Sequence, residues 1–137
     1  MIKSVKIYGA GSIGNHLAQA SRRKGWDVTI VDVEDQALWR TEKEIYPTRY
    51  GSWDESIRLL NCGDKDDNNY DLIIVGTPPD SHLHIAIEAL RHNPKAILIE
   101  KPATSLDLTG ADDLIKKSSE CGVRLFVGYD HVVSKSI

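Results

Sequence analysis

The chain has 137 residues, of which 41% are hydrophobic and 27% charged, and its formal net charge is −3. This size favours one domain with a substantial buried core. The slight acidity, without a basic stripe, argues against a general affinity for nucleic acid. The two cysteines, Cys62 and Cys121, lack metal-type spacing, and neither a leader nor a membrane span can be recognised. We therefore expect a cytoplasmic protein with free thiols, no bound metal, and no membrane or nucleic-acid partner.

Three glycines follow the first apolar run of the chain. The pattern Gly-x-Gly-x-x-Gly at Gly9, Gly11 and Gly14 comes after a predicted strand over residues 4–8 and opens a predicted helix over 13–24. Gly9 permits a tight turn, Gly11 lets the main chain approach a pyrophosphate, and Gly14 lets the helix pack close to the strand. The N-terminus of the helix then attracts phosphate groups. This order predicts a dinucleotide-binding βαβ unit.

The second apolar run places an acid beside this turn. A strand over 27–31 follows the helix stop at Gly25 and ends at Asp32, 18 positions after Gly14. That spacing is close to the one expected for a carboxylate that binds the adenosine ribose. Such a carboxylate accepts hydrogen bonds from both ribose hydroxyls and repels a 2′-phosphate, and the next two residues supply no cation. We therefore expect NAD rather than NADP, although a simple cap at the strand end fits the same acid.

Between the second strand and residue 70, prolines, glycines and capping residues mark the boundaries of the predicted elements. In chain order they predict a helix over 35–45 that Asp35 caps and Pro47 ends, a short third strand or extended link over 50–53, a helix over 54–60 that Ser52 or Asp54 caps, and a loop over 63–69. The loop is acidic and rich in amides. We expect it to be solvated and to form no binding motif.

The second half repeats the alternation of strands and helices. Its elements are predicted to be a strand over 72–76, a helix over 81–92, a strand over 96–99, a helix that Ser105 or Asp107 caps and that ends near Cys121, and a strand over 123–127 after a stop at Gly122. This alternation implies parallel pairing with right-handed crossovers. We therefore predict an α/β fold: a doubly wound Rossmann sheet of six mostly parallel strands in the order 3-2-1-4-5-6, with helices on both faces.

Two further segments follow strands at the sheet edge where ligands of open α/β folds bind. The segment from Gly76 to His82 contains two prolines, which stiffen the chain there, but it is equally typical of an ordinary helix entry. Lys101 lies after the fifth strand, where an ammonium group can hydrogen-bond a substrate hydroxyl and ease its deprotonation. In isolation, an exposed ion pair of Glu100 with Lys101 is the commoner explanation.

Taken together, these segments resemble a known family. The glycine pattern is followed in order by Thr77-Pro78-Pro79-Asp80-Ser81-His82, Glu100-Lys101-Pro102 and Val127-Gly128-Tyr129-Asp130-His131. This set is similar to the nucleotide-binding half of the Gfo/Idh/MocA oxidoreductases, and the resemblance covers essentially all of residues 1–137. It implies NAD(P)-dependent hydride transfer, usually at a hydroxyl or ketone carbon of a sugar, cyclitol or related small molecule.

The resemblance also implies roles for particular residues. Lys101 would be the catalytic lysine that touches the reacting hydroxyl, and the Lys101–Pro102 bond is a candidate for the cis form. Glu100 would approach the nicotinamide ribose. With the glycine pattern and Asp32 included, the remaining cofactor-binding residues are Gly9, Gly11, Ser12, Ile13, Gly14, Asp32, Thr77, Pro78, Asp80 and His82.

The sequence departs from the family in two ways. The family commonly has an asparagine before a basic and aromatic pair after the last strand, whereas this chain has Asp130 followed by His131, so neither receives a role. Family members also continue into a second α/β domain that supplies proton-transfer residues and most of the substrate pocket. We expect residues 1–137 to form only the cofactor domain and to bind NAD without efficient turnover. Because of an uncovered apolar edge, we expect either a homo-oligomer, in the form of a dimer, or a monomer prone to self-association. The alternative is a free-standing NAD(P)-binding sensor or regulatory module without catalysis.

Overall fold

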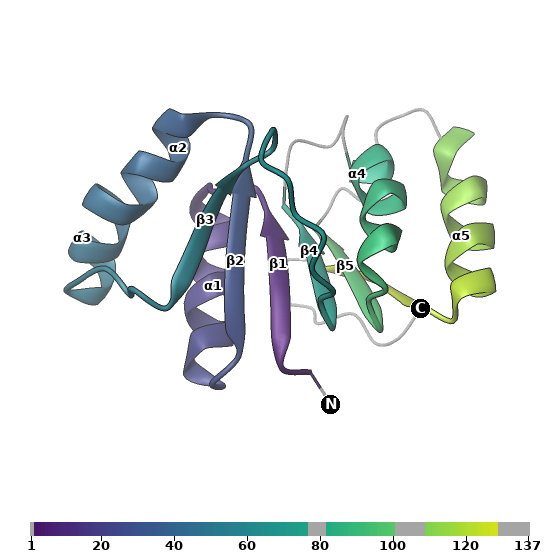
Figure 1. The fold of residues 1–137 in the computed structure, drawn as a ribbon, viewed down its shortest axis with the longest axis horizontal. Helices are drawn as coiled ribbons and strands as arrows, with labels where there is room; N and C mark the ends of the chain where they lie inside the picture. The colour runs from purple at the N-terminus through teal and green to yellow at the C-terminus, as the bar shows by residue number, and fades with distance from the viewer. Residues whose placement is uncertain (1, 77–81, 101–108, 129–137) are drawn as a thin grey trace.

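Six strands form one sheet in the computed structural model, which describes residues 2–76, 82–100 and 109–128. Neighbouring strands all pair in parallel, in the order β3-β2-β1-β4-β5-β6 (Figure 1). The strands are β1 (Ser4–Tyr8), β2 (Asp27–Asp32), β3 (Ile57–Asn61), β4 (Leu72–Val75), β5 (Ala96–Glu100) and β6 (Arg124–Gly128). This order and direction confirm the predicted Rossmann sheet.

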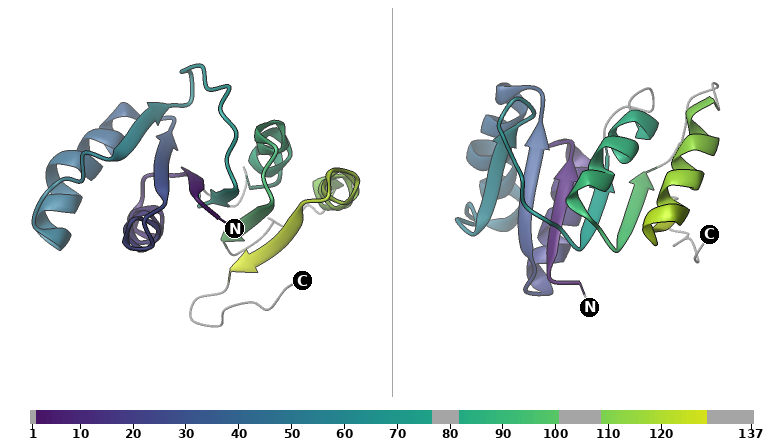
Figure 2. Two further views of the ribbon diagram at one scale, coloured as in Figure 1. Left: turned by 60° about the horizontal axis from the view of Figure 1, so that its bottom comes forward. Right: turned by 45° about the vertical axis from the view of Figure 1, so that its right-hand side comes forward.

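Helices cover both faces of the sheet, as the left view of Figure 2 shows. On one face lie α1 (Ser12–Arg23), α2 (Asp35–Arg40), the π turn η1 (Thr41–Ile45) and α3 (Tyr46–Tyr50). On the opposite face lie α4 (His82–Ala89), the short 3-10 turn η3 (Leu90–His92) and α5 (Thr109–Cys121). None of the described helices is long and apolar enough to cross a membrane.

The central strands are buried on both faces of the sheet. Ile7 and Ile30 pack into the core beneath α1, whereas Tyr8 and Val31 pack into the core beneath α4. Such two-sided burial is what a parallel sheet between helices requires. Lys6 lies in the middle of β1 and is only 3% exposed, so its buried charge needs a partner.

The third strand differs from the prediction. β3 occupies most of the stretch predicted as a helix over 54–60, and no strand forms at 50–53. It pairs in parallel along the open edge of β2. Asp54 accepts the N–H of Ser56 at 2.9 Å, and so closes a turn before the strand instead of capping a helix. Pairing with β2 outweighs the weak helical preference of this stretch, because tertiary context routinely overrides local propensity.

The second predicted helix continues past its expected end. Pro47 does not stop it, and the helical run ends at Gly51, whose φ of 89° is left-handed. A π turn explains the difference. The N–H of Tyr46 reaches back to the carbonyl of Thr41, and Pro47 then falls in the first turn of α3, where a missing N–H is tolerated. Asp35 lies inside the first turn of α2 and is not its cap.

The connection from β3 to β4 is a loop, as predicted, but it is not simply solvated. Residues 62–71 form no helix, and they replace the crossover helix of most parallel connections. Asp66 in the middle of the loop is 6% exposed, and its carbonyl accepts a hydrogen bond from Arg91 of η3 at 2.7 Å. The loop therefore packs onto the same face of the sheet as α4.

Candidate functional site

The turn after β1 adopts the conformation that its glycines allow. Gly9 has a φ of 110°, and its N–H donates to the carbonyl of Val31 at 2.8 Å. A Cβ on Gly14 would collide with the carbonyl oxygen of Gly9, so only glycine lets α1 pack this close to β1. A Cβ on Gly11 would meet nothing within 4 Å. The predicted glycine positions thus form one tight turn with open space beside Gly11.

A buried carboxamide holds this turn against the second helical segment. Asn15 has no exposed surface, and its Nδ2 lies 3.1 Å from the carbonyl of Ala10 and 2.9 Å from that of Gly11. The same nitrogen lies 3.2 Å from Oγ1 of Thr41, whose hydroxyl donates to the carbonyl of Ala37 at 3.1 Å. These contacts fix the glycine turn, α1 and η1 to one another.

Asp32 ends β2 directly beside the glycine turn. One of its carboxylate oxygens accepts the N–H of Ala10 at 2.8 Å, and the other accepts that of Glu34 at 2.9 Å. The side chain therefore does cap main-chain groups, and it also lines a cleft. Each carboxylate oxygen can accept more than one hydrogen bond, so Asp32 retains acceptor capacity for a ligand.

The cleft has a volume of about 520 Å³ and lies where β1, β2 and β4 end. Its polar wall includes Asp32, Glu34 and Arg40, and its apolar wall includes Val31, Val33 and Ile85. Arg40 comes from α2 and not from Val33 or Glu34, the two residues that directly follow Asp32. The cleft therefore contains a guanidinium group that the sequence argument for NAD did not include.

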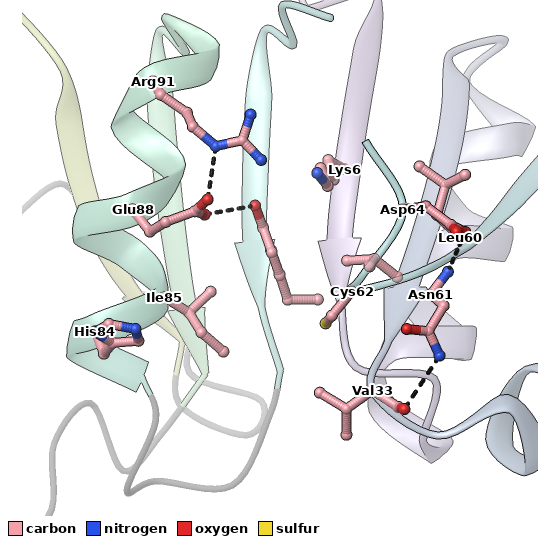
Figure 3. Close-up of a pocket in the computed structure, with 12 residues that line it drawn as sticks. Lys6, Val33, Leu60, Asn61, Cys62, Asp64, His84, Ile85, Glu88 and Arg91 are labelled. Carbon is pink, nitrogen blue, oxygen red and sulfur yellow. Dashed lines mark hydrogen bonds and ion pairs between the residues drawn. The ribbon is translucent and has the colours of Figure 1, made fainter. Parts of the chain in front are cut away.

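A second chamber, of about 420 Å³, continues from the cleft over the α4 face of the sheet (Figure 3). The cleft and the chamber share several residues, among them Tyr8, Cys62 and Ile85. Inside the chamber, the hydroxyl of Tyr8 donates to Glu88 at 3.4 Å, and Arg91 donates to the same carboxylate at 2.6 Å. Burial and the negative charge of Glu88 raise the pKa of Tyr8, so its hydroxyl stays protonated.

Lys6, which lines this chamber, belongs to a buried ion pair. Nζ of Lys6 lies 2.9 Å from Oδ2 of Asp66, which also accepts the hydroxyl of Tyr70 at 2.7 Å. Desolvation raises the pKa of Asp66, but the hydrogen bonds from Lys6 and Tyr70 outweigh it and hold this pKa well below its usual range. The pair thereby fastens the β3–β4 loop to the middle of β1.

His92 completes this cluster in its neutral form. Its Nε2 lies 3.0 Å from Nζ of Lys6, and its Nδ1 lies 2.6 Å from the carbonyl of Asn68. An ammonium group can only donate, so Nε2 accepts and Nδ1–H donates to the carbonyl. Burial lowers the pKa of His92, and its contact with Asn68 only partly offsets this effect.

The remaining predicted site residues fall at the carboxyl edge of the sheet or outside the described part of the chain. Ser12 and Ile13 form the first turn of α1, where Ile13 is 53% exposed. Glu100 ends β5, and its Cγ lies 4.0 Å from where a Cβ on Gly76 would be. His82 begins α4, but its side chain is not described. The residues outside the described ranges are Thr77, Pro78, Asp80 and Lys101, together with the Lys101–Pro102 bond.

Three polar residues at this site were missed by sequence reasoning. Asn15 was detectable, because it shares the buried face of α1 with Gly14 and Ala18 at helical spacing. Arg40, and Arg49 of α3, which donates to Oγ of Ser12 at 2.9 Å, carry no such signal. The position of Arg49 depends on the π turn, which the sequence did not reveal, whereas Arg40 lies before that turn and reaches the cleft from α2 by its side chain.

The sheet order, the glycine turn at the start of α1 and the cleft beside Asp32 define a dinucleotide-binding Rossmann domain. The chain belongs to the GFO_IDH_MocA oxidoreductase family with an NAD-binding Rossmann fold, whose sequence profile matches residues 3–129. This match confirms the family resemblance. No curated protein matches the chain.

Solved structures share the fold at low sequence identity. (S)-3-hydroxybutyryl-CoA dehydrogenase PaaH1 from Ralstonia eutropha has a TM-score of 0.61 and 20% identity over 94% of this chain and 50% of its own. The dehydrogenase part of multifunctional enzyme 1 from C. elegans has a TM-score of 0.61 and 19% identity over 90% of this chain and 31% of its own. A conserved hypothetical protein from Pyrococcus furiosus has a TM-score of 0.57 and 19% identity over 93% of this chain and 95% of its own. The chain thus spans half or less of the two dehydrogenases.

Proposed function

We propose that the cleft binds NAD and that the protein serves hydride transfer at a hydroxyl or ketone carbon of a sugar, cyclitol or similar small molecule. The observation that supports NAD binding is that two features of the turn and the strand end lie side by side. The open space beside Gly11, at the N-terminus of α1, adjoins the same cleft as the carboxylate of Asp32. A diphosphate and its neighbouring ribose need these two features side by side.

The residues present fit this cofactor. The main-chain N–H groups at Ser12 and Ile13 would hold the pyrophosphate, and Asp32 would accept the ribose hydroxyls. The adenine would lie against the apolar wall that includes Val33 and Ile85. When bound, the nicotinamide supplies the hydride chemistry. The family resemblance assigns Lys101 to the substrate hydroxyl, and that assignment stays a prediction.

Calorimetry with NADH and NADPH tests the choice of cofactor. We expect NADH to bind more tightly, because the Asp32 carboxylate repels a 2′-phosphate and accepts the free hydroxyls. Asp32→Asn should weaken NADH binding by about tenfold, since a charge-assisted hydrogen bond becomes a neutral one. The control is Asp27→Asn at the opposite end of β2, which is exposed and should leave affinity unchanged.

Tighter binding of NADPH, or an unchanged affinity for NADH in Asp32→Asn, would contradict this role. Urea unfolding of each variant separates a loss of binding from a loss of structure, because Asp32 also accepts the N–H groups of Ala10 and Glu34.

We also propose that residues 1–137 alone turn over little substrate, that the protein works in the cytoplasm, and that it self-associates. Two exposed free cysteines support a reducing compartment. Assays of sugar and cyclitol oxidation with NAD, and light scattering of the same sample, test turnover and association.

A further inference from the structure

An arginine from the second helical segment reaches the start of α1. Nη2 of Arg49 donates to Oγ of Ser12 at 2.9 Å, and Ser12 is the residue directly after Gly11. Arg49 is exposed, and within the described part of the chain no carboxylate forms an ion pair with it. A guanidinium group has five N–H donors, and this contact uses one. Most of its donors are therefore available beside the glycine turn.

The fold holds Arg49 in this place. α3 is anchored by Tyr46, which is 1% exposed and packs against the rings of Tyr50 and Trp53 with centroids 4.8 and 5.0 Å away. At its other end, η1 is tied to α1 through Thr41 and Asn15. The helical run is thus fixed at two points, and from its last turn the side chain of Arg49 reaches the start of α1.

The charges that line the cleft leave a bound dinucleotide without enough positive charge around it. Its described lining contains the two acids Asp32 and Glu34 and a single cation, Arg40. A dinucleotide adds two negative charges on its pyrophosphate, and a helix N-terminus supplies only about half a positive charge. Arg49 carries a full charge and a donor fork that matches phosphate oxygens.

We propose that Arg49 binds the pyrophosphate of the dinucleotide, with Ser12 holding the guanidinium at the turn until the cofactor arrives. The assignment rests on the proposed function. In this arrangement, the N-terminus of α1 supplies main-chain donors to one side of the diphosphate, and Arg49 of α3 supplies a cationic side chain to the other.

The test compares three probes on three variants. NADH and ADP both contain a diphosphate, whereas adenosine contains none. Arg49→Ala removes the cation, and Arg49→Lys keeps the charge without the fork. Arg23→Ala is the control, because Arg23 is also an exposed arginine but lies at the far end of α1. Affinities for NADH and ADP come from calorimetry, and that for adenosine comes from NMR titration.

We expect Arg49→Ala to bind NADH and ADP about tenfold more weakly than the wild type, with adenosine affinity unchanged and with Arg49→Lys in between. Equal ADP affinity in Arg49→Ala and the wild type would overturn the assignment while NAD binding stands. A parallel loss of adenosine affinity would also overturn it, because Arg49 would then act only through the structure of the cleft. Failure of the wild type to bind NADH or ADP would instead refute the proposed function and this inference with it.

Discussion

Breaking the buried ion pair under the β3–β4 loop should destabilise the domain severely. The side chains of Lys6 and Asp66 are only 3% and 2% exposed, and 2.9 Å separates Nζ from Oδ2. Asp66→Asn keeps the shape but leaves the ammonium group of Lys6 buried without its counter-charge. Removing one partner of such a pair costs about 3–5 kcal/mol. Since domains are typically stable by about 5–15 kcal/mol, this loss is a large part of the free energy of unfolding.

Urea unfolding followed by circular dichroism measures this free energy. The decisive variant is the double substitution Lys6→Met with Asp66→Asn, which removes both charges. It should be more stable than Asp66→Asn, because it no longer buries an unpaired ammonium group, although Nε2 of His92 then loses its contact with Nζ of Lys6. Asp67→Asn is the matched control in the same loop. Its pair with Lys65 is 74% and 86% exposed and should contribute less than about 0.5 kcal/mol.

Two results would refute this reasoning. A loss below about 1 kcal/mol in Asp66→Asn would mean that water or another group compensates Lys6. A double variant no more stable than Asp66→Asn would mean that packing, and not the unpaired charge, accounts for the loss.

The remaining predictions concern the glycine turn and acid conditions. Gly14→Ala should destabilise the domain by about 1–3 kcal/mol and weaken NADH binding, because its Cβ collides with main chain, whereas Gly63→Ala meets only an ordinary contact at 3.5 Å. Thermal unfolding checks this, and equal melting of both variants would contradict it. Stability should also fall on acidification, because the folded-state pKa values of His92 and Asp66 both lie below their ordinary values of 6.5 and 3.8. The His92 contribution is present above pH 6.5 and is lost as pH falls below it, and the Asp66 contribution is lost below about pH 4. Urea midpoints measured across pH 3–8 follow both contributions. If the midpoint of His92→Gln fell with pH between 6.5 and 5 as steeply as that of the wild type, the assigned contribution of His92 would be contradicted.

Much of the fold was predictable, because its signals are local. Each central strand is a short apolar run, and Gly25 and Gly122 both adopt the positive φ expected of a helix stop. The sequence predicted a helix where β3 forms, because the strand character of these residues depends on pairing with the edge of β2, which is a tertiary contact. The prediction that Pro47 ends the helix was wrong, because the effect of a proline depends on the hydrogen-bonding pattern of the turn before it.

The site was predictable where it depends on the main chain and not where it depends on distant side chains. The glycine turn and Asp32 lie within one βαβ unit, so spacing along the chain placed them together. Arg40 enters the same cleft from α2 by way of side-chain reach, and Arg49 reaches Ser12 over a separation of 37 residues. Asp66 lies in a stretch of polar residues, and nothing in that stretch distinguishes it from its solvated neighbours. Its burial depends on the contact with Lys6 of β1, which forms only in the folded protein.

The cluster beneath the loop ties together three parts of the chain that are remote in sequence. Lys6 lies on the first strand, Asp66 in the crossover and His92 at the end of the helical segment after β4. Because Lys6 contacts both Asp66 and His92, a change at Lys6 leaves both partners without their shared contact, and a change at Asp66 leaves the buried ammonium group without its counter-charge. Evolutionary change at these positions should therefore come as coordinated replacements, and transplanting this loop into a homologue should succeed only when the matching strand and helix residues travel with it.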